Sequence, residues 1–442
     1  MRPKIKISDF TYSLPQERIA RYPLTERDSS KLLVFRKDKF KDSINYKLEK
    51  ESFSIEDDTF YNISKYLPEN SFMVFNNTKV VPARLHFRKP TGAVIEVLCL
   101  NPVLPNDYVM SFASVGSCEW NVVLGNAKRW KSGDIQFIGA PQINLRAELV
   151  RKGDEKGSVV KFKWDTNATF SEVLDICGQV PIPPYLNRKT EAIDKTRYQT
   201  IYAKIEGSVA APTAGLHFTD RVLKSLDNKG IKRDNVCLHV GAGTFIPVKS
   251  EFIADHNMHK EPFSVSRQFL ADLAALPPAE KVISVGTTTT RTLESLYFIG
   301  IQCIERENAF GCGKETSAGE AVSGGNRGLK AFIGFSPEIV GQWVPYDKEY
   351  NYSLKESVEA IIRYLDANKL QRLVAGTSII IVPGYKFHVV DIQITNFHQP
   401  QSTLLLLIAA IVGDGWKEAY KHAMENGYRF LSYGDSCLLF RE

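Results

Sequence analysis

The chain has 442 residues, of which 43% are hydrophobic and 24% are charged, so it can bury a large core without metal or disulfide staples. Lys and Arg outnumber Asp and Glu by 56 to 50, a mild positive charge that permits an anionic partner without requiring one. Seven scattered cysteines without a C-x-x-C pair exclude a disulfide scaffold and a zinc ribbon. The longest aliphatic run, 404–412, is too short for a bilayer, and no apolar stretch follows the charged N-terminus. We therefore expect a cytoplasmic protein without a membrane partner.

Residues 72–163 have a β-rich texture. After a polar N-terminal region with one strand at 31–35, short apolar runs alternate with turn residues and show no helical periodicity. Short strands at this spacing predict a small barrel or sandwich, which we place at residues 76–164. The expected strands are 80–87, 93–100, 108–114, 121–124, 135–138, 145–150 and 158–162.

From residue 170 the pattern changes to alternating strands and helices. Thr219, Ser266 and Ser402 stand as N-caps before apolar helical runs, and further helices are expected at 353–370 and 416–425. The sequence therefore predicts an α/β domain formed by both chain ends, 1–75 and 165–442, with the β-rich segment inserted. Six glycines predict a flexible loop at 306–330. Strands are expected at 235–240, 281–285, 379–382, 387–390 and 437–440.

An expected strand leads into glycines at 238–245, as at the start of a nucleotide-binding site. Gly241 and Gly243 follow the strand as in Rossmann folds, including Rossmann methyltransferases. The pattern then fails, because Phe245 occupies the next glycine position and Pro247 keeps the chain extended where a helix must begin. A loop that cradles a substrate and a tight turn between strands both remain open.

Residues 208–219 are mostly small and include Thr213, Gly215 and His217. Small side chains allow a ligand to approach the backbone closely. At the start of a helix the dipole lowers the pKa of His217 and favours the neutral ring that can act as a base. A packed loop with a hydrogen-bonded histidine is the structural alternative.

A glycine and four threonines, 286–290, lie between an expected strand and an expected helix. Free N–H groups and hydroxyls at a helix start can hold an anion, and Arg291 adds a cation suited to a carboxylate or phosphate. The spacing is not that of a P-loop. We expect Thr287, Thr288 and Arg291 to bind an anion, with a simple threonine N-cap as the alternative.

His256 and His259 have the spacing of two metal ligands on one helical turn, with Asp255 and Glu261 beside them. No third ligand is evident in the sequence, and H-x-x-H alone is a weak pattern. We therefore expect no metal site.

Basic residues gather with an aromatic at Lys128, Arg129, Trp130 and Lys131, on an expected hairpin of the β-rich segment. Such a cluster suits the phosphates of a nucleic acid, with the indole available for base stacking. A solvated charged face is the structural alternative.

About ten segments of this kind occur in order along most of the chain. They include 76–84 (NNTKVVPAR), 183–185 (PPY), 197–200 (RYQT), 207–219, 238–247, 285–295, 383–385 (PGY), 394–398 (ITNFH), 402–406 and 432–435 (SYGD). Together they resemble the S-adenosylmethionine:tRNA ribosyltransferase-isomerase family of queuosine biosynthesis. The chain departs from the family pattern in two places. Asn77 replaces the usual aspartate, and residues 298–376 form a longer segment than in the usual member.

The resemblance implies an L-shaped, two-domain fold in which an α/β domain carries an inserted β-barrel. It also implies two substrates, S-adenosylmethionine and a tRNA bearing 7-aminomethyl-7-deazaguanine at the wobble position. The products would be epoxyqueuosine-tRNA, methionine and adenine. Because S-adenosylmethionine is consumed as the ribosyl donor, no cofactor is expected. We also expect a monomer.

This chemistry needs a base for the 5′ carbon of the ribose, which the adjacent sulfonium acidifies, and an acid for the departing adenine. We expect catalytic roles for His217, His239, His398, Asp391 and Asp435. We expect S-adenosylmethionine to contact Thr213, Gly215, Gly241, Gly243, Thr287, Thr288, Arg291 and Glu294. We expect tRNA to contact Lys79, Arg84, Lys128, Arg129 and Lys131. A Rossmann-like RNA methyltransferase and a non-catalytic tRNA-binding protein are the alternatives.

Overall fold

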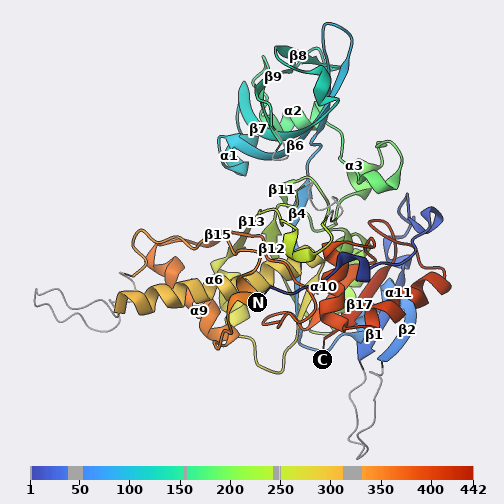
Figure 1. Ribbon diagram of the computed structural model, residues 1–442, viewed down its shortest axis with the longest axis vertical. Helices are drawn as coiled ribbons and strands as arrows, with labels where there is room; N and C mark the ends of the chain where they lie inside the picture. The colour runs from blue at the N-terminus through green and yellow to red at the C-terminus, as the bar shows by residue number, and fades with distance from the viewer. Residues whose placement is uncertain are drawn as a thin grey trace, which may run out of the picture. The chain divides into compact units, whose positions relative to one another are not determined.

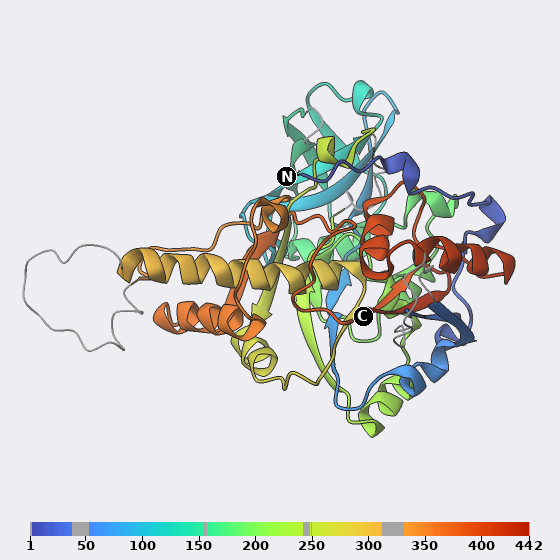
Figure 2. The ribbon, with the colours of Figure 1, turned by 60° about the horizontal axis from the view of Figure 1, so that its bottom comes forward.

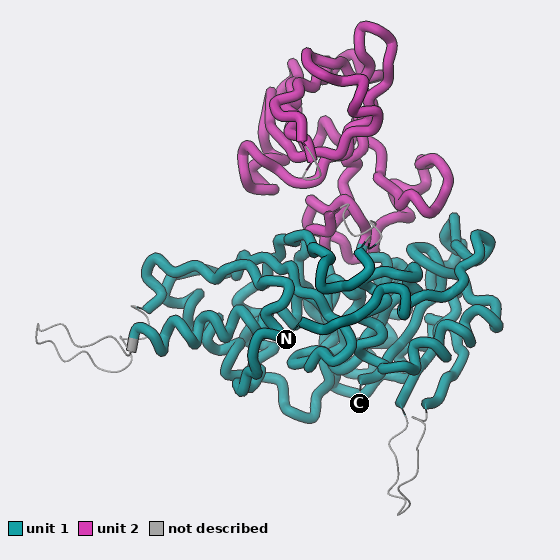
Figure 3. Tube along the Cα trace, viewed as in Figure 1, with its two compact units in different colours: residues 1–77, 212–238, 247–442 teal, residues 78–211, 239–246 magenta. Residues whose placement is uncertain are grey.

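The chain forms two compact units, drawn as a ribbon of the computed structural model in Figure 1 and coloured separately in Figure 3. The structure describes residues 2–37, 53–153, 157–241, 248, 250–311 and 331–441. The first unit comprises residues 1–77, 212–238 and 247–442, and the second comprises 78–211 and 239–246. The first unit is α/β and the second contains a closed barrel, which confirms the predicted fold class.

A nine-stranded sheet is the centre of the first unit. In sheet order its strands are β15 (Arg372–Thr377), β13 (Glu261–Ser266), β12 (Lys232–Leu238), β3 (Phe72–Asn76), β14 (Val282–Val285), β16 (Ile392–Asn396), β17 (Ser436–Phe440), β1 (Lys31–Lys37) and β2 (Phe53–Thr59). Strands β12, β3, β14 and β16 run parallel, so their carboxyl ends meet at one edge. β3, β14 and β16 are buried along their whole length.

The helices of the first unit are α4 (Asp220–Asn228), α5 (Arg267–Ala274), α6 (Thr287–Gly311), α8 (Val344–Asp347), α9 (Leu354–Ala367), α10 (Thr403–Val412) and α11 (Gly415–Glu425). The side chains of Thr219, Ser266 and Ser402 accept backbone N–H groups in the first turns of α4, α5 and α10, which confirms the predicted caps. Helices α6 and α9 lie side by side (Figure 2). Their contact requires glycine, because a Cβ on Gly300 would come within 2.0 Å of Ser357 Oγ.

Two expected strands are wrong. Residues 379–382 and 387–390 are irregular, and the strands nearby are β15, before the first segment, and β16, after the second. The N–H groups of His388, Val389 and Val390 bind the carboxylate of Glu294 instead of a neighbouring strand. The loop expected at 306–330 is helical as far as Gly311, and residues 312–330 lie outside the described residues.

The barrel of the second unit is built, in order around it, from β10 (Ser158–Lys163), β7 (Ser117–Gly125), β6 (Val94–Leu104), β5 (Arg84–Arg88), β8 (Asp134–Phe137) and β9 (Arg146–Arg151). Trp120 and Trp130 are among the largest side chains of its core. The unit also contains the paired strands β4 (Thr78–Val80) and β11 (Ile205–Ser208) and the helices α1 (Tyr108–Phe112), α2 (Phe170–Cys177) and α3 (Asp194–Arg197).

The second unit differs from the expected inserted segment in its secondary structure and in its bounds. The strand expected at 108–114 is helix α1, because the side chain of Asp107 accepts the N–H of Met110 and starts a helical turn. The unit also extends beyond residue 164, because Phe170, Val173 and Leu174 of α2 pack into the barrel core. Residues 165–211 and 239–246 therefore belong to the unit of the barrel, and their predicted place in the α/β domain is wrong.

Candidate active site

Three segments of the first unit meet at the carboxyl ends of its parallel strands. Gly286 follows β14 and begins the turn into α6, and Asn396 ends β16. The 3-10 helix Thr213–His217 lies against both: a Cβ on Gly286 would be 3.8 Å from that of Ala214, and Asn396 Nδ2 is 3.0 Å from His217 Nε2. Ligands bind at this edge of open α/β sheets. The small-residue loop and the threonine run thus come together here.

His217 is buried, and both of its ring nitrogens are hydrogen-bonded. Nδ1 lies 2.8 Å from Ser30 Oγ, and Nε2 lies 3.0 Å from Asn396 Nδ2, which also donates to the carbonyl of Leu431 and is thereby fixed as a donor. Nε2 is therefore an acceptor and Nδ1–H a donor to Ser30. Burial lowers the pKa of His217 to about 3, so the ring is neutral at pH 7. These contacts match the structural alternative, a packed and hydrogen-bonded histidine.

His398, just past β16, is held on three sides but has one open ring nitrogen. The hydroxyl of Tyr12 donates to its carbonyl, its N–H donates to Tyr420 Oη at 3.0 Å, and Thr395 Oγ1 lies 2.9 Å from its Nε2. Among the described residues, Nδ1 has no hydrogen-bond partner. Burial lowers the pKa of His398 to about 3, so the ring is neutral at pH 7. A fixed, neutral imidazole with a free nitrogen is the form that a proton acceptor needs.

His239 and Gly241 belong to the second unit, and Gly243 lies outside the described residues. The His239 ring stacks on Tyr108 with centroids 4.3 Å apart, and burial lowers its pKa to about 4. Gly207 makes room for this ring, since a Cβ there would lie 2.6 Å from Nδ1. A Cβ on Gly241 would meet no atom of the described residues within 4 Å, so no close contact among them requires a glycine at that position.

Among the four threonines after Gly286, two have hydroxyls that form hydrogen bonds with other described residues and two have hydroxyls that do not. Thr289 donates to the carbonyl of Val285, and Thr290 donates to Gln393 Oε1, with Ser284 Oγ 2.8 Å from the same hydroxyl. In the described part of the chain, the hydroxyls of Thr287 and Thr288 take part in no hydrogen bond. One capping hydroxyl would be enough to start the helix. The free pair therefore leaves polar groups available at the N-terminus of a 25-residue helix.

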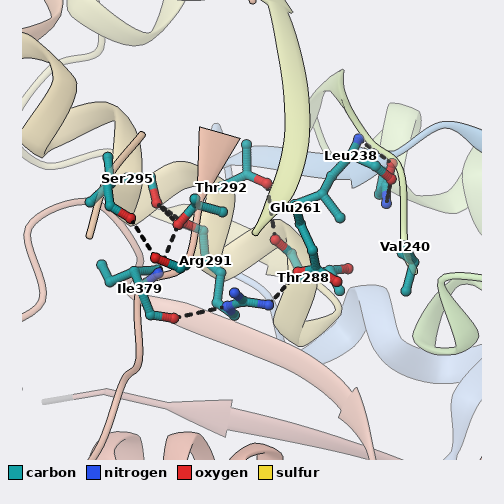
Figure 4. A network of polar contacts seen from close by, with 12 residues as sticks. Leu238, Val240, Glu261, Thr288, Arg291, Thr292, Ser295 and Ile379 are labelled. Atoms are coloured by element: carbon teal, nitrogen blue, oxygen red, sulfur yellow. Dashed lines mark hydrogen bonds and ion pairs between the residues drawn. The ribbon is translucent and has the colours of Figure 1, made fainter. Parts of the chain in front are cut away.

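Arg291, which we expect to bind an anion, already forms bonds within the protein. Its Nη1 forms an ion pair with Glu261, and its Nε donates to the carbonyl of Ile379 at 3.1 Å (Figure 4). Nη2 is buried and has no partner among the described residues. A guanidinium binds a carboxylate in a bidentate way through two neighbouring nitrogens, either Nη1 with Nη2 or Nε with Nη2. Because Nη1 and Nε are already bonded, Arg291 cannot bind a ligand carboxylate in this way.

The carboxylates of three predicted site residues accept hydrogen bonds from groups of the protein itself. Glu294 accepts Tyr385 Oη and three backbone N–H groups at 2.9–3.0 Å, so its carboxylate has no position left for a ligand. Asp391 precedes β16, at the end opposite His398, where it binds the N–H of Val282. A five-residue strand spans about 16 Å, so Asp391 cannot orient that ring.

Asp435 lies near the carboxyl end of β16, since β17 runs antiparallel to it. Its carboxylate accepts the N–H of Lys31 and both the N–H and a guanidinium nitrogen of Arg429 at 2.8–3.1 Å. The charge of Arg429 in turn helps to lower the pKa of His217. Asp435 therefore fixes an arginine near the site and does not contact a histidine ring.

The predicted tRNA contacts on the second unit differ in their charge balance. Lys79 pairs with Glu206 at 2.8 Å, and Arg84 lies 3.4 Å from Glu96. Lys128, Arg129 and Lys131 are exposed, and within the described ranges none of them has a carboxylate partner. These three residues form what we call the hairpin cation cluster. Lys89 and Lys152 bring further positive charge to it by binding the carbonyls of Arg129 and Ala127.

The expected stacking role of the hairpin aromatic is wrong. Trp130 is fully buried in the barrel core, and its indole N–H donates to the carbonyl of Gly133 at 2.9 Å. The apolar area of an indole favours burial wherever the barrel has room for it. Of residues 128–131, only the three charged side chains are exposed.

Several residues that hold the site carried no strong sequence signal. Ser30, Tyr12 and Tyr420 are far along the chain from the histidines they contact. Thr395 lies three residues before His398 and could have been noticed as its neighbour. Over the described ranges, no three His, Cys, Asp or Glu side chains gather as metal ligands do, and no helix is both long and apolar enough to cross a membrane.

Comparisons with known proteins agree with the resemblance. The family model described as queuosine biosynthesis protein matches residues 7–316 and 356–439, so the unmatched stretch, 317–355, is shorter than the long segment expected at 298–376. S-adenosylmethionine:tRNA ribosyltransferase-isomerase from Halothermothrix orenii is 36% identical to this chain, with 98% of this chain and 100% of the relative covered. A relative of the same name from Caldanaerobacter subterraneus subsp. tengcongensis is 35% identical to this chain, and the match again covers 98% of this chain and 100% of the relative.

A solved structure of S-adenosylmethionine tRNA ribosyltransferase from Thermotoga maritima is 24% identical to this chain. The comparison covers 98% of this chain and 99% of that one, with a TM-score of 0.41. The family model alone matches well over half of the residues, and the relatives match along their full length. The chain therefore belongs to the queuosine biosynthesis protein family.

Proposed function

We propose that this chain is an S-adenosylmethionine:tRNA ribosyltransferase-isomerase, which moves the ribosyl group of S-adenosylmethionine onto tRNA in queuosine biosynthesis. Relatives of this name match 98% of the chain. The acceptor that we propose is 7-aminomethyl-7-deazaguanine at the wobble position, and the product is epoxyqueuosine-tRNA. We further propose that the enzyme acts as a monomer in the cytoplasm and consumes S-adenosylmethionine without a cofactor.

His398 is the base that removes the proton from the 5′ carbon beside the sulfonium. The observation that supports this role is the open Nδ1 of His398, whose Nε2 contacts Thr395 and whose backbone is held by Tyr12 and Tyr420. His217 is a poorer candidate because both of its nitrogens are occupied. Loss of the proton opens the furanose and expels adenine, which leaves as an anion and needs one proton. The proton taken up by the imidazole is available for that purpose.

The aminomethyl nitrogen of the tRNA base then adds to the opened sugar. Closure to a cyclopentane and displacement of methionine form the epoxide. The methionine carboxylate is the anion that Thr287 and Thr288 hold, together with the first N–H groups of α6. Arg291 supports this helix start through Glu261 and Ile379 and does not grip the carboxylate directly.

The hairpin cation cluster binds phosphates of the tRNA. Exposed cations without carboxylate partners gain most from replacing the counterions of a polyanion. Lys79 and Arg84 are weaker candidates because Glu206 and Glu96 already lie beside them.

One assay separates this function from its alternatives. The protein is incubated with S-adenosylmethionine and with tRNA that carries 7-aminomethyl-7-deazaguanine, and the small products are identified. Adenine and methionine in equal amounts support the proposal. S-adenosylhomocysteine would indicate an RNA methyltransferase, and tRNA binding without any product would indicate a non-catalytic binding protein.

A further inference from the structure

The hydroxyl of Thr395 lies between two acceptors. Its Oγ1 is 2.9 Å from Nε2 of His398 and 3.3 Å from the carbonyl oxygen of Asn396. The residue is 1% exposed, and no other group of the described residues bonds to its hydroxyl. A hydroxyl has one proton to donate, so a bond donated to Asn396 leaves Oγ1 as an acceptor towards the imidazole.

We propose that Thr395 is a positioning residue that accepts Nε2–H of His398 and so keeps the lone pair of the ring on Nδ1. The proposal rests on the function proposed above, in which Nδ1 receives the 5′ proton. A ring that carried its proton on Nδ1 could not accept another there. The carbonyl of Asn396 makes the productive arrangement possible, because it takes the hydroxyl proton that would otherwise point at Nε2.

The same arrangement also supports the ring after proton transfer. An imidazolium donates from both nitrogens, and each donor needs an acceptor when it is buried. With Thr395 as the acceptor for Nε2–H, a chain of two hydrogen bonds runs from Nε2 through Oγ1 to the carbonyl of Asn396. Nothing on the Nε2 side has to reorient when Nδ1 takes up the proton, so this side of the ring is prepared for both charge states.

The backbone of His398 is fixed independently of Thr395. Tyr12 donates to its carbonyl and Tyr420 accepts its N–H, so the loop stays in place when the threonine hydroxyl is removed. The loss of that hydroxyl then changes which ring nitrogen carries the proton without moving the residue. This separation makes the proposal testable by substitution.

His217 provides an internal contrast. Its Nε2 faces the amide donor of Asn396 and its Nδ1 faces Ser30 Oγ, so its proton lies on Nδ1. The two histidines at the end of β16 are therefore expected in opposite tautomers. A single spectrum can display both.

The test is nitrogen-15 NMR of the histidine side chains, which distinguishes a protonated from an unprotonated ring nitrogen. The chain has 8 histidines, and His398→Gln identifies the signals of His398 by their loss. In the wild-type protein at pH 7 we expect protonated Nε2 and free Nδ1 for His398. Thr395→Val, which keeps the shape of the side chain, should mix the tautomers, and Thr395→Ser should restore them. Ser30→Ala should change the signals of His217 and leave those of His398 in place.

Adenine release supplies the second readout. Thr395→Val should slow it about tenfold at saturating substrates, the loss expected for one hydrogen bond, with the S-adenosylmethionine dissociation constant unchanged. Thr395→Ser should keep the wild-type rate. Protonated Nδ1 in the wild-type spectrum, or a Thr395→Val protein with the wild-type tautomer and rate, would overturn the proposal. Absence of adenine release from the wild-type protein would instead refute the proposed function. The spectra would still show whether Thr395 keeps the proton of the His398 ring on Nε2.

Discussion

Arg291 on α6 and Glu261 at the start of β13 form an ion pair whose side chains are only 7% and 2% exposed. Both charges are out of water, so neither is tolerated without the other. Nε of the same arginine holds the carbonyl of Ile379. The first turn of α6 is thus tied to two other segments of the first unit.

Arg291→Ala should therefore destabilise the protein. Loss of the arginine from a buried ion pair costs about 3–5 kcal/mol of unfolding free energy, measured by urea denaturation. The control is Arg267→Ala, which breaks a pair with Asp366 whose side chains are 35% and 44% exposed. That change should cost at most about 1 kcal/mol. Equal losses for the two variants would contradict the structural role of Arg291.

The free hydroxyls at the start of α6 should affect binding more than stability. Thr287→Val combined with Thr288→Val should weaken S-adenosylmethionine binding about tenfold by calorimetry, because two donors to the carboxylate are lost. The affinity of decarboxylated S-adenosylmethionine should stay the same. Unchanged affinity for S-adenosylmethionine would remove the carboxylate from this helix start.

Thr289→Val is the matched control for these hydroxyls. Its hydroxyl donates to the carbonyl of Val285 and is fully buried, so its loss should lower the unfolding free energy by about 1 kcal/mol. Its effect on S-adenosylmethionine binding should be small. The neighbouring threonines would then have separable roles.

The buried histidines should make the fold sensitive to acid. The pKa of His217 is lowered from 6.5 to about 3, so in this interval the unfolded chain binds a proton that the folded chain does not. The stabilisation is complete above pH 6.5 and is lost progressively as the pH falls towards 3. His217→Asn should flatten the slope of unfolding free energy against pH between 5 and 6.5, a window chosen because most carboxylates titrate below it. An unchanged slope would contradict the burial of a neutral ring.

The hairpin cation cluster should account for part of the salt dependence of tRNA binding. Replacing Lys128, Arg129 and Lys131 by glutamine should weaken binding and reduce the slope of log Kd against log salt by up to about 0.9 for each lost phosphate contact. The matched control is Lys79→Gln, since Glu206 already neutralises that lysine. A triple variant with the same slope as the wild-type protein would identify the cluster as a solvated face.

The parts of the fold with local signals were predictable. Thr219, Ser266 and Ser402 cap helices as their sequence positions indicate. Most of the β-rich texture of residues 72–163 corresponds to the barrel, although residues 72–76 form β3 of the nine-stranded sheet. The strand predicted at 387–390 is wrong although the apolar pattern of these residues suits a strand. Their N–H groups donate to Glu294, nearly a hundred residues away in the sequence. Such tertiary partners override local propensity and leave no local trace.

The sequence predicts which segments form the site better than it predicts the role of each residue in them. The loops 213–217, 286–288 and 396–398 do meet at one edge of the sheet. The sequence could not show that Ser30 and Asn396 occupy both nitrogens of His217, or that Glu261 engages Arg291. Those contacts depend on which side chains the fold brings within 3 Å, and this is decided by packing over the whole chain.

The most direct measurement is the stoichiometry of adenine, methionine and modified tRNA in one reaction mixture. The protein, S-adenosylmethionine and tRNA bearing 7-aminomethyl-7-deazaguanine should yield the three products in a 1:1:1 ratio, with His398→Gln as the inactive control. The same tRNA with unmodified guanine should yield none, because it lacks the aminomethyl nitrogen that attacks the sugar. Adenine release that is independent of the modified base, or S-adenosylhomocysteine in place of adenine, would contradict the proposed ribosyl transfer.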